Sequence, residues 1–403
     1  MPKSTYFFGQ SVFGQLISLI DPGIISHAVR LTKADRYYKQ FSTRDHLISM
    51  LFGVQAHCTS LREICGSMMG LKGKLEHFGV EHVPHRSTLS DANRNRSSEV
   101  FAHIYYGLVR RYRSILSDSR SSVFEGKKLS IIDSTTISLF KDILKAAGKT
   151  PASGKAKGGI KVHTEMSLEG QLPTLVWYTA AAKNDVLFVQ HKRDFQKENI
   201  YVFDRGYIDY EFYERLNKEQ IGFVTRLKDN ASYQIKEELQ ISDDDPDALL
   251  KDELIELPIR KNGHIIRTVG LRRIAWWDEL NQRRFTFLTN LLDLKAESVA
   301  LIYKQRWQIE LLFKQLKQNF PLKYFFGDSQ NAIIIQIWCA LIANLLLTII
   351  RKQLTRKTAF SYIASFVRVN LINYIQLVSF LNNPEKDWNS ELTTDMQQPL
   401  FPT

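Results

Sequence analysis

The stretch YKQRWQIELLFKQLK, residues 303–317, has the spacing of an amphipathic helix with an unusual polar face. At about 100° per residue, five polar side chains fall in one narrow sector beside an apolar stripe: Tyr303, Arg306, Glu310, Lys314 and Lys317. The glutamate is therefore a lone carboxylate among groups that commonly bind phosphate. Ordinary i,i+4 pairing on an exposed helix face is the simpler explanation, and it would contribute roughly a few tenths of a kcal/mol.

Two more carboxylates follow hydrophobic strands. The run LSIID ends at Asp133, and the run IYVFD ends at Asp204. A carboxylate at the edge of a buried strand is costly unless it is paired or bound to a metal, and α/β sheets bind ligands at that edge. Taken singly, each aspartate also suits an ordinary turn or helix cap, as the following DST and DRG residues show.

The three carboxylates are more informative together than singly. Asp133, Asp204 and Glu310 can supply hard oxygen ligands for two Mg²⁺ ions, an arrangement used for in-line displacement at phosphorus. The basic groups on the helix would then hold a DNA backbone, with lysine as a point charge and arginine as a bidentate fork. The sequence therefore predicts a metal-dependent phosphoryl-transfer site.

Composition agrees with a nucleic-acid partner. The chain has 403 residues, 44% of them hydrophobic, and a formal net charge of +12. It can bury a substantial core in two or three domains, and its charge favours nucleic acid ahead of an acidic membrane surface. Three scattered cysteines and an N-terminus without a secretory pattern predict the cytoplasm.

One apolar segment, residues 333–350, is about as long as a bilayer-spanning helix. Gln336, Asn344 and Thr348 interrupt it, and it directly follows the basic amphipathic helix. We therefore expect a buried core helix and no membrane partner.

The N-terminal region, residues 1–125, is basic and has helical periodicity, so it predicts an all-α DNA-binding domain. Residues 43–70 contain two apolar-periodic runs, which suits a helix-turn-helix. Residues 83–101 are polar. There Arg86, Arg94 and Arg96 are either available for phosphates or part of a solvated loop, and the sequence leaves both interpretations open.

After residue 125 the pattern changes to short strands, three in succession and then strands alternating with helices, which indicates a mixed α/β sheet flanked by helices. An Asn262-Gly263 pair between two strands predicts a hairpin. We expect four further segments: a first core part at 126–229, a β-rich insertion at 230–284, a second core part at 285–325, and C-terminal helices with a tail at 326–403.

Several other motifs carry little weight. The glycine-rich run 153–163 lacks Walker spacing, so no nucleotide cofactor is expected. The acidic run 242–247 suits a solvated loop better than a calcium site. His163 and Glu165 share a strand face and could approach the metals, although an ordinary sheet role is favoured. Five Cys and His residues do not have zinc-finger spacing: Cys58, Cys65, His77, His82 and His85.

At the residues quoted above, the chain resembles the DDE transposases of bacterial insertion sequences. The resembling subgroup has Tyr, two residues, Arg, three residues, Glu, six residues and Lys, which here are Tyr303, Arg306, Glu310 and Lys317. The DST and DRGY runs at Asp133 and Asp204 resemble the other two motifs of that family. The resemblance covers residues 125–320, and the N-terminal region is similar to a helical domain found in one branch.

The resemblance implies a ribonuclease H-like fold with a β insertion before the last catalytic helix. Asp133, Asp204 and Glu310 would hold two Mg²⁺ ions, with Mn²⁺ able to substitute. The residues expected to contact DNA are Tyr303, Arg306, Lys314, Lys317 and Arg205, with either Trp276 or Trp277 against a flipped base. Since adjacent strand residues point to opposite faces, at most one of the two tryptophans should serve.

The implied activity is cleavage at the ends of an insertion sequence and joining of the 3′-OH ends to target DNA. The implied partners are terminal inverted repeats, target DNA and a second copy of the chain in a synaptic complex, within a bacterial cytoplasm and associated with the nucleoid. Two alternatives stay open. One is a metal-dependent nuclease without strand joining, and the other is a non-catalytic DNA-binding regulator.

Overall fold

The computed structural model describes residues 9–80, 83–117, 123–124, 126–138, 159–191, 194–241 and 246–385. These residues form two compact units. The sheet unit takes the described residues from Val123 to Phe313, and the helical unit takes those before Val123 and from Lys314 onward. Four segments singled out above lie outside the described residues: His82, most of the glycine-rich run, most of the acidic run and the C-terminal tail.

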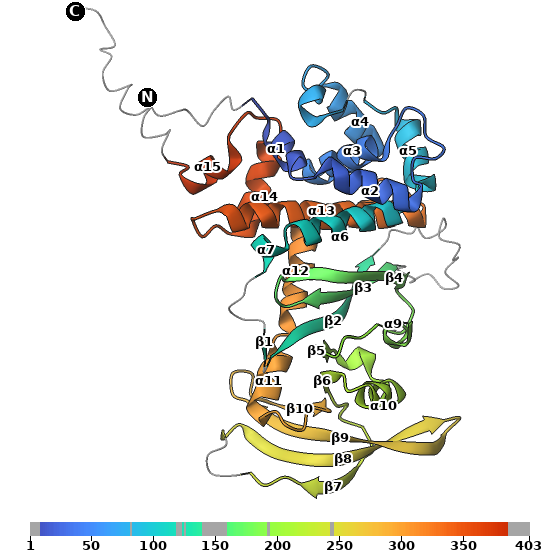
Figure 1. Cartoon of the computed structure of the whole chain (residues 1–403), viewed down its shortest axis with the longest axis vertical. Coiled ribbons are helices and arrows are strands. Elements are labelled where there is room, and N and C mark those ends of the chain that lie inside the picture. Colours follow the sequence, from blue (N-terminus) through green and yellow to red (C-terminus); the bar gives the residue numbers. More distant parts are fainter. Residues whose placement is uncertain are drawn as a thin grey trace, which may run out of the picture. The chain divides into compact units, whose positions relative to one another are not determined.

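The sheet unit is built on one mixed sheet, seen in Figure 1 from β4 to β7. Among the described residues its strand order is β4-β3-β2-β5-β6-β10-β9-β8-β7, with β1 paired to β2. The strands are β1 Val123–Phe124, β2 Lys127–Ser138, β3 Gly159–Ser167, β4 Leu172–Ala180, β5 Asn199–Phe203, β6 Gly222–Arg226, β7 Gln234–Glu238, β8 Leu249–Lys261, β9 His264–Asp278 and β10 Arg283–Thr289. Only the central pairs β2–β5 and β5–β6 are parallel. The mixed α/β fold class is confirmed.

Helices cover both faces of the central strands. Helix α10, Tyr210–Lys218, packs its Phe212 and Tyr213 rings against Phe203 and Phe223. Helix α11, Ala296–Lys304, packs Tyr303 against Phe287. Because Phe287 is paired with Arg226, and Phe223 points the other way from Arg226, the two helices lie on opposite faces. Strand β5 is buried along nearly its whole length, as a strand covered on both sides should be.

Strands β8 and β9 form a long hairpin whose turn has positive φ at both central residues, +52° at Asn262 and +84° at Gly263. Asn and Gly adopt this conformation at little cost, so the turn is the one that the sequence predicts. Arg272 of β9 binds Asp252 of β8 with both atoms buried, 2.5 Å apart. This pairing fixes the base of the hairpin.

The helical unit contains α1 Val12–Ser18, α2 Pro22–Thr32, α3 Thr43–Gln55, α4 Leu61–Met69, η1 Leu75–Phe78, α5 Arg86–Asn95, α6 Glu99–Arg111, α7 Arg113–Leu116, α13 Gln330–Gln353, α14 Phe360–Val369 and α15 Leu377–Asn382. Helix α12, Trp307–Asn319, runs from the sheet unit into this one. Helix α13 is long and apolar enough to cross a membrane, but 89% of its apolar window is buried inside the protein. It packs against α3, α5, α6, α7 and α14, as a core helix does.

The polar residues that interrupt α13 serve this packing. Gln336 donates to the carbonyls of Pro321 and Tyr324, both at 2.8 Å, and accepts from the backbone N–H of Phe326. Asn344 accepts from Gln315 of α12 at 2.7 Å. A buried amide is tolerated because its hydrogen-bonding groups are satisfied.

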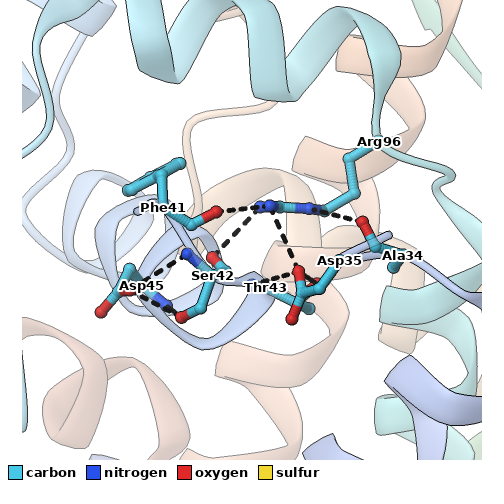
Figure 2. A network of polar contacts seen from close by, with 7 residues as sticks. All are labelled: Ala34, Asp35, Phe41, Ser42, Thr43, Asp45 and Arg96. Atoms are coloured by element: carbon cyan, nitrogen blue, oxygen red, sulfur yellow. Dashed lines mark hydrogen bonds and ion pairs between the residues drawn. The ribbon is translucent and has the colours of Figure 1, made fainter. Parts of the chain in front are cut away.

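One interpretation of the polar run 83–101 is corrected. Arg96 cannot bind phosphate, because its side chain is fully buried. Its guanidinium donates to the carbonyls of Phe41 at 2.6 Å, Ser42 at 3.1 Å and Ala34 at 3.5 Å, and it pairs with Asp35 (Figure 2). Fully buried arginines are rare, so the sequence alone favours a surface position.

We expect Gln336→Leu to destabilise the helical unit, because three buried backbone groups of the 321–326 turn lose their partner. At about 1 kcal/mol per hydrogen bond, the total is roughly 2–4 kcal/mol, measured as a lowered Tm. Thr348→Val is the control, since Thr348 bonds only a carbonyl of its own helix. Equal Tm values for the two variants would contradict the role assigned to Gln336.

Candidate active site

The parallel pairing of β2 and β5 brings the two aspartates together. Ile132 is in register with Phe203, so Asp133 and Asp204 are the next residues at the same edge and on the same face. Asp133 differs from the sequence prediction in one respect, since β2 continues to Ser138 by pairing with β3. Asp133 therefore marks the end of the parallel pairing rather than the end of its strand.

Helix α12 carries the third carboxylate, that of Glu310, and Arg306 links Glu310 to Asp133. One guanidinium nitrogen of Arg306 donates to Asp133 Oδ2 at 3.0 Å, and another donates to Glu310 Oε1 at 2.5 Å. The Arg306 side chain is 16% exposed and that of Asp133 is 13% exposed. A single arginine thus bridges the first and third predicted catalytic carboxylates.

Asp204 belongs to the same cluster. The pKa of Asp133 is raised to about 7, chiefly by burial and also by Asp204 and Glu310, while the Ser134 backbone N–H and Arg306 oppose the rise. Burial alone would lower the pKa of Arg306, but Tyr303 and the two carboxylates outweigh it, so that pKa is raised. Three carboxylates and one guanidinium carry a net charge of −2 when all are ionised, which leaves the site short of positive charge.

This shortage fits a divalent cation with oxygen ligands. In the described part of the chain, however, no three His, Cys, Asp or Glu side chains are placed to hold a metal ion together. At this site the Arg306 guanidinium pairs with both Asp133 and Glu310 and occupies the position between them. The residue types fit Mg²⁺, and their present arrangement is that of an arginine-bridged cluster.

The other predicted DNA-contacting residues divide between the two units. Tyr303 is buried against Phe287 and lies near Arg306, with its ring centroid 5.9 Å from the guanidinium carbon. Arg205 is half exposed and pairs with Asp229 at 3.5 Å. Lys314 and Lys317 lie further along α12, in the helical unit, where burial lowers the pKa of Lys317.

The structure separates the two tryptophans. Trp276 pairs with Phe285 across the sheet, and Trp277 pairs with Arg284, so the two point to opposite faces. The Phe285 ring stacks on Phe287, 5.9 Å between centroids, and Phe287 contacts Tyr303. Trp276 therefore lies on the face of the carboxylate cluster.

Sequence reasoning missed an arginine pair on that face. The guanidinium carbons of Arg226 and Arg283 each lie 4.5 Å from the Phe285 ring centroid. The Arg226 Nε is buried and has no hydrogen-bond partner among the residues that the structure describes. Burial lowers the pKa of Arg226, and Arg205 and Arg283 lower it further. The position of Arg226 at the end of β6, beside β5, was the available signal.

A fourth carboxylate, Asp185, was also missed. Its Oδ1 accepts from Ser134 Oγ at 2.9 Å and from Lys161 Nζ at 3.0 Å, and lies 3.7 Å from His163 Nδ1. Ser134 follows Asp133 and therefore points to the opposite face of the sheet. Burial lowers the pKa of His163 to about 4, so His163 is neutral near pH 7. It is fully buried against Phe188 and Tyr207, which is the sheet role that the sequence favoured.

Asp185 also contacts the turn after Asp204. A Cβ atom on Gly206 would lie 2.9 Å from Asp185 Oδ2, closer than packing allows. Ser134 and Gly206, which follow Asp133 and Asp204 in the chain, thus both contact the Asp185 carboxylate on the opposite face of the sheet.

The fold and the site together define a ribonuclease H-like fold, with two aspartates where the parallel pairing of β2 and β5 ends and a glutamate on a following helix. Residues 125–346 match the family of transposase DDE domains, and residues 8–81 match a domain family of unknown function. The chain belongs to the DDE transposase family. Membership of the subgroup defined by Tyr303, Arg306, Glu310 and Lys317 stays a prediction.

Proteins similar to this chain are themselves named as transposases. A putative transposase of Sinorhizobium fredii is 30% identical over 293 residues, 71% of this chain and 78% of that protein. A probable insertion-sequence transposase of Geobacillus stearothermophilus is 29% identical over 270 residues, 65% of this chain and 69% of that protein. A solved piggyBac transposase synaptic complex with hairpin DNA aligns over 96% of this chain and 86% of that chain, at 11% identity and a TM-score of 0.41.

We expect Gly206→Ala to destabilise the sheet unit by about 1–3 kcal/mol, because the added methyl must displace Asp185 or the turn. The measurement is the Tm. Gly270→Ala is the matched control within the same unit, since a Cβ there meets nothing within 4 Å. A Gly206→Ala protein as stable as the control would show that Asp185 does not pack under this turn.

Proposed function

We propose that this chain is an insertion-sequence transposase that cleaves DNA at the ends of its element and joins the freed 3′-OH ends to target DNA. One observation carries the proposal. Asp133, Asp204 and Glu310, which lie far apart in the sequence, form one negatively charged cluster beside Arg306. Membership of the DDE family supports the same reading.

Asp133, Asp204 and Glu310 are the proposed ligands of two Mg²⁺ ions, with Mn²⁺ able to substitute. Their net charge and their oxygen donors favour hard divalent cations. When bound, such ions supply Lewis-acid stabilisation of charge on the attacking and leaving oxygens. The chain contributes the ligands and their fixed placement on β2, β5 and α12.

Arg306 has two proposed roles. In the DNA-free chain it holds the two carboxylates that it bridges, and so substitutes for missing positive charge. A DNA phosphate offers the same fork a new partner with matching bidentate geometry. Transfer of Arg306 from Asp133 and Glu310 to phosphate frees both carboxylates at the moment when the substrate is present, which couples metal binding to DNA binding.

The remaining DNA contacts are assigned by position. Tyr303, Arg205, Lys314 and Lys317 are proposed to bind phosphates of the element end, together with Arg226, whose unpaired Nε supports this role. Trp276 is the better candidate for stacking a base, because it shares the face of the cluster, whereas Trp277 points away. The proposed setting is a homodimer that pairs two inverted repeats in the bacterial cytoplasm, associated with the nucleoid.

Asp133→Asn, Asp204→Asn or Glu310→Gln should each reduce Mg²⁺-dependent cleavage of element ends by at least about 10²–10³-fold, because the site loses a charged ligand. DNA affinity in EDTA should stay near that of the unchanged protein. Asp293→Asn is the control, since this aspartate is exposed and is not one of the clustered carboxylates.

Cleavage is followed on labelled ends in the presence of a plasmid target. Joined products support a transposase, whereas cut but unjoined ends point to a nuclease. Undiminished cutting by any one variant removes that residue from the site, and metal-independent binding without cleavage by the unchanged protein favours a regulator.

Arg306→Ala should bind Mn²⁺ about tenfold more tightly than the unchanged protein when DNA is absent, because the competing guanidinium is gone. Electron paramagnetic resonance of free Mn²⁺ measures this directly. An element-end duplex should tighten Mn²⁺ binding to the unchanged protein but not to Arg306→Ala. Arg283→Ala is the matched control, and equal Mn²⁺ affinities for both variants would refute the exchange.

A further inference from the structure

A row of basic residues lies on the helical unit and has no part in the proposed chemistry. It runs along the second half of α2 and the turns that follow, with a basic side chain at every third position: His27, Arg30, Lys33, Arg36 and Lys39. All five are exposed. His27 and Arg30 lie one turn apart on α2, whereas Lys33, Arg36 and Lys39 lie in the turns that follow it, and we call these five residues the α2 ridge.

The ridge is not neutralised by its surroundings. Between residues 22 and 44 the single acidic residue is Asp35. Within the described residues, Arg30, Lys33, Arg36 and Lys39 make no ion pair. Asp21, just before α2, pairs with Arg111 at 2.7 Å.

The other nearby acids are turned inward. Asp35 accepts from the Thr43 backbone N–H at 2.8 Å and from the Thr43 hydroxyl at 2.7 Å, besides pairing with Arg96. Asp45 forms a capping box with Ser42 at the start of α3 (Figure 2). The acids thus serve the fold, and the cations face solvent.

The turn that carries the ridge is held rigidly from below. Arg96 binds the carbonyls of Ala34, Phe41 and Ser42, so it fastens both ends of the segment, and its guanidinium carbon lies 4.0 Å from the Tyr38 ring centroid. Burying a guanidinium is costly unless nearly every donor is used. The network in Figure 2 holds this segment at both ends.

Two exposed apolar residues accompany the cations. Tyr37 is 83% exposed, with the Arg36 guanidinium 5.4 Å from its ring centroid, and Leu31 is 55% exposed. A tyrosine beside fixed cations suits a polyanion that also offers sugars and bases.

We infer that the α2 ridge binds the phosphate backbone of duplex DNA, as a contact surface of the helical unit additional to the carboxylate cluster. The inference rests on the proposed function in that it takes DNA as the polyanion. Exposed cations on a segment that is already held in place lose little entropy on binding a polyanionic backbone.

A membrane surface fits less well. A helix that lies on a membrane needs its apolar face free for lipid. The apolar face of α2 is already used, because Ile25 and Ala28 are buried and a Cβ on Gly107 of α6 would meet Ile24 at 2.6 Å. Anionic lipid is therefore the alternative outcome of the test.

The test compares two triple variants of the full chain. Lys33→Gln/Arg36→Gln/Lys39→Gln removes three ridge cations, and Arg62→Gln/Lys72→Gln/Lys74→Gln removes the same residue types from exposed positions at α4 and the turns after it. The probe is a fluorescein-labelled random duplex of about 40 base pairs, titrated in EDTA at several salt concentrations.

The ridge variant should bind about 10-fold to 100-fold more weakly at moderate salt, and the slope of log K against log salt should fall by about 2–3, close to 0.9 per lost phosphate contact. The control variant should stay within about threefold. Equal losses in the two variants, or no loss in the ridge variant, would overturn the inference. So would a variant that keeps DNA affinity but loses binding to phosphatidylglycerol vesicles.

Arg96→Lys tests the rigid support separately. It keeps the charge but loses the fork to three carbonyls, so amide exchange across residues 34–42 should accelerate and DNA affinity should fall with the salt slope unchanged. Unchanged exchange would refute the role of Arg96. DNA binding is measured in EDTA and is therefore independent of cleavage. A ridge variant that loses DNA affinity supports the role of the ridge even if the Asp133→Asn protein still cuts DNA. A ridge variant that keeps its affinity, together with an Asp133→Asn protein that no longer cuts, supports the proposed chemistry alone.

Discussion

The sheet unit depends on how negative charge is tolerated at one edge of its central strands. Asp133 and Asp204 are brought together by the parallel pairing of the buried runs 129–132 and 200–203, and Glu310 joins them from α12. Such a cluster is unstable without positive charge, and the chain supplies one guanidinium, from Arg306. The raised pKa of Asp133, caused first by burial, reflects how incomplete that compensation is. A site that is held together and still short of cations is prepared for metal ions.

The sheet separates this cluster of three carboxylates from a fourth, that of Asp185. Asp185 lies beneath the opposite face, where Lys161 compensates its charge and neutral His163 packs beside it. Ser134 and Gly206 connect the two sides, since each is close in sequence to one of the clustered aspartates and contacts Asp185 in space. The aspartates can thus be positioned from below without adding another negative charge to the metal-binding face.

What the sequence could predict follows from local patterns. The strand that leads into Asp204 and the Asn262-Gly263 turn depend on residues close together in the chain, and the structure contains both. The single helix expected over residues 303–317 is instead divided, because α11 ends at Lys304 and α12 begins at Trp307, with Arg306 between them. Asp133 likewise lies within β2 rather than at its end. The bridging role of Arg306, the support from Asp185 and the burial of Arg96 depend on strand register and on contacts between distant residues. No spacing rule records these contacts, so charged residues were assigned to the surface or to DNA by default.

Arg96 and Arg306 show how the acceptors decide what an arginine does. Arg96 is fully buried and binds three main-chain carbonyls that no ion or phosphate can displace without unfolding the loop, so its contacts are permanent. Arg306 keeps 16% of its side chain exposed, and its anchors are two carboxylates, which a divalent ion binds with greater charge. A phosphate group can bind the forked Arg306 guanidinium as well as a carboxylate does. The same residue type therefore fixes one surface of this chain and leaves another able to exchange partners.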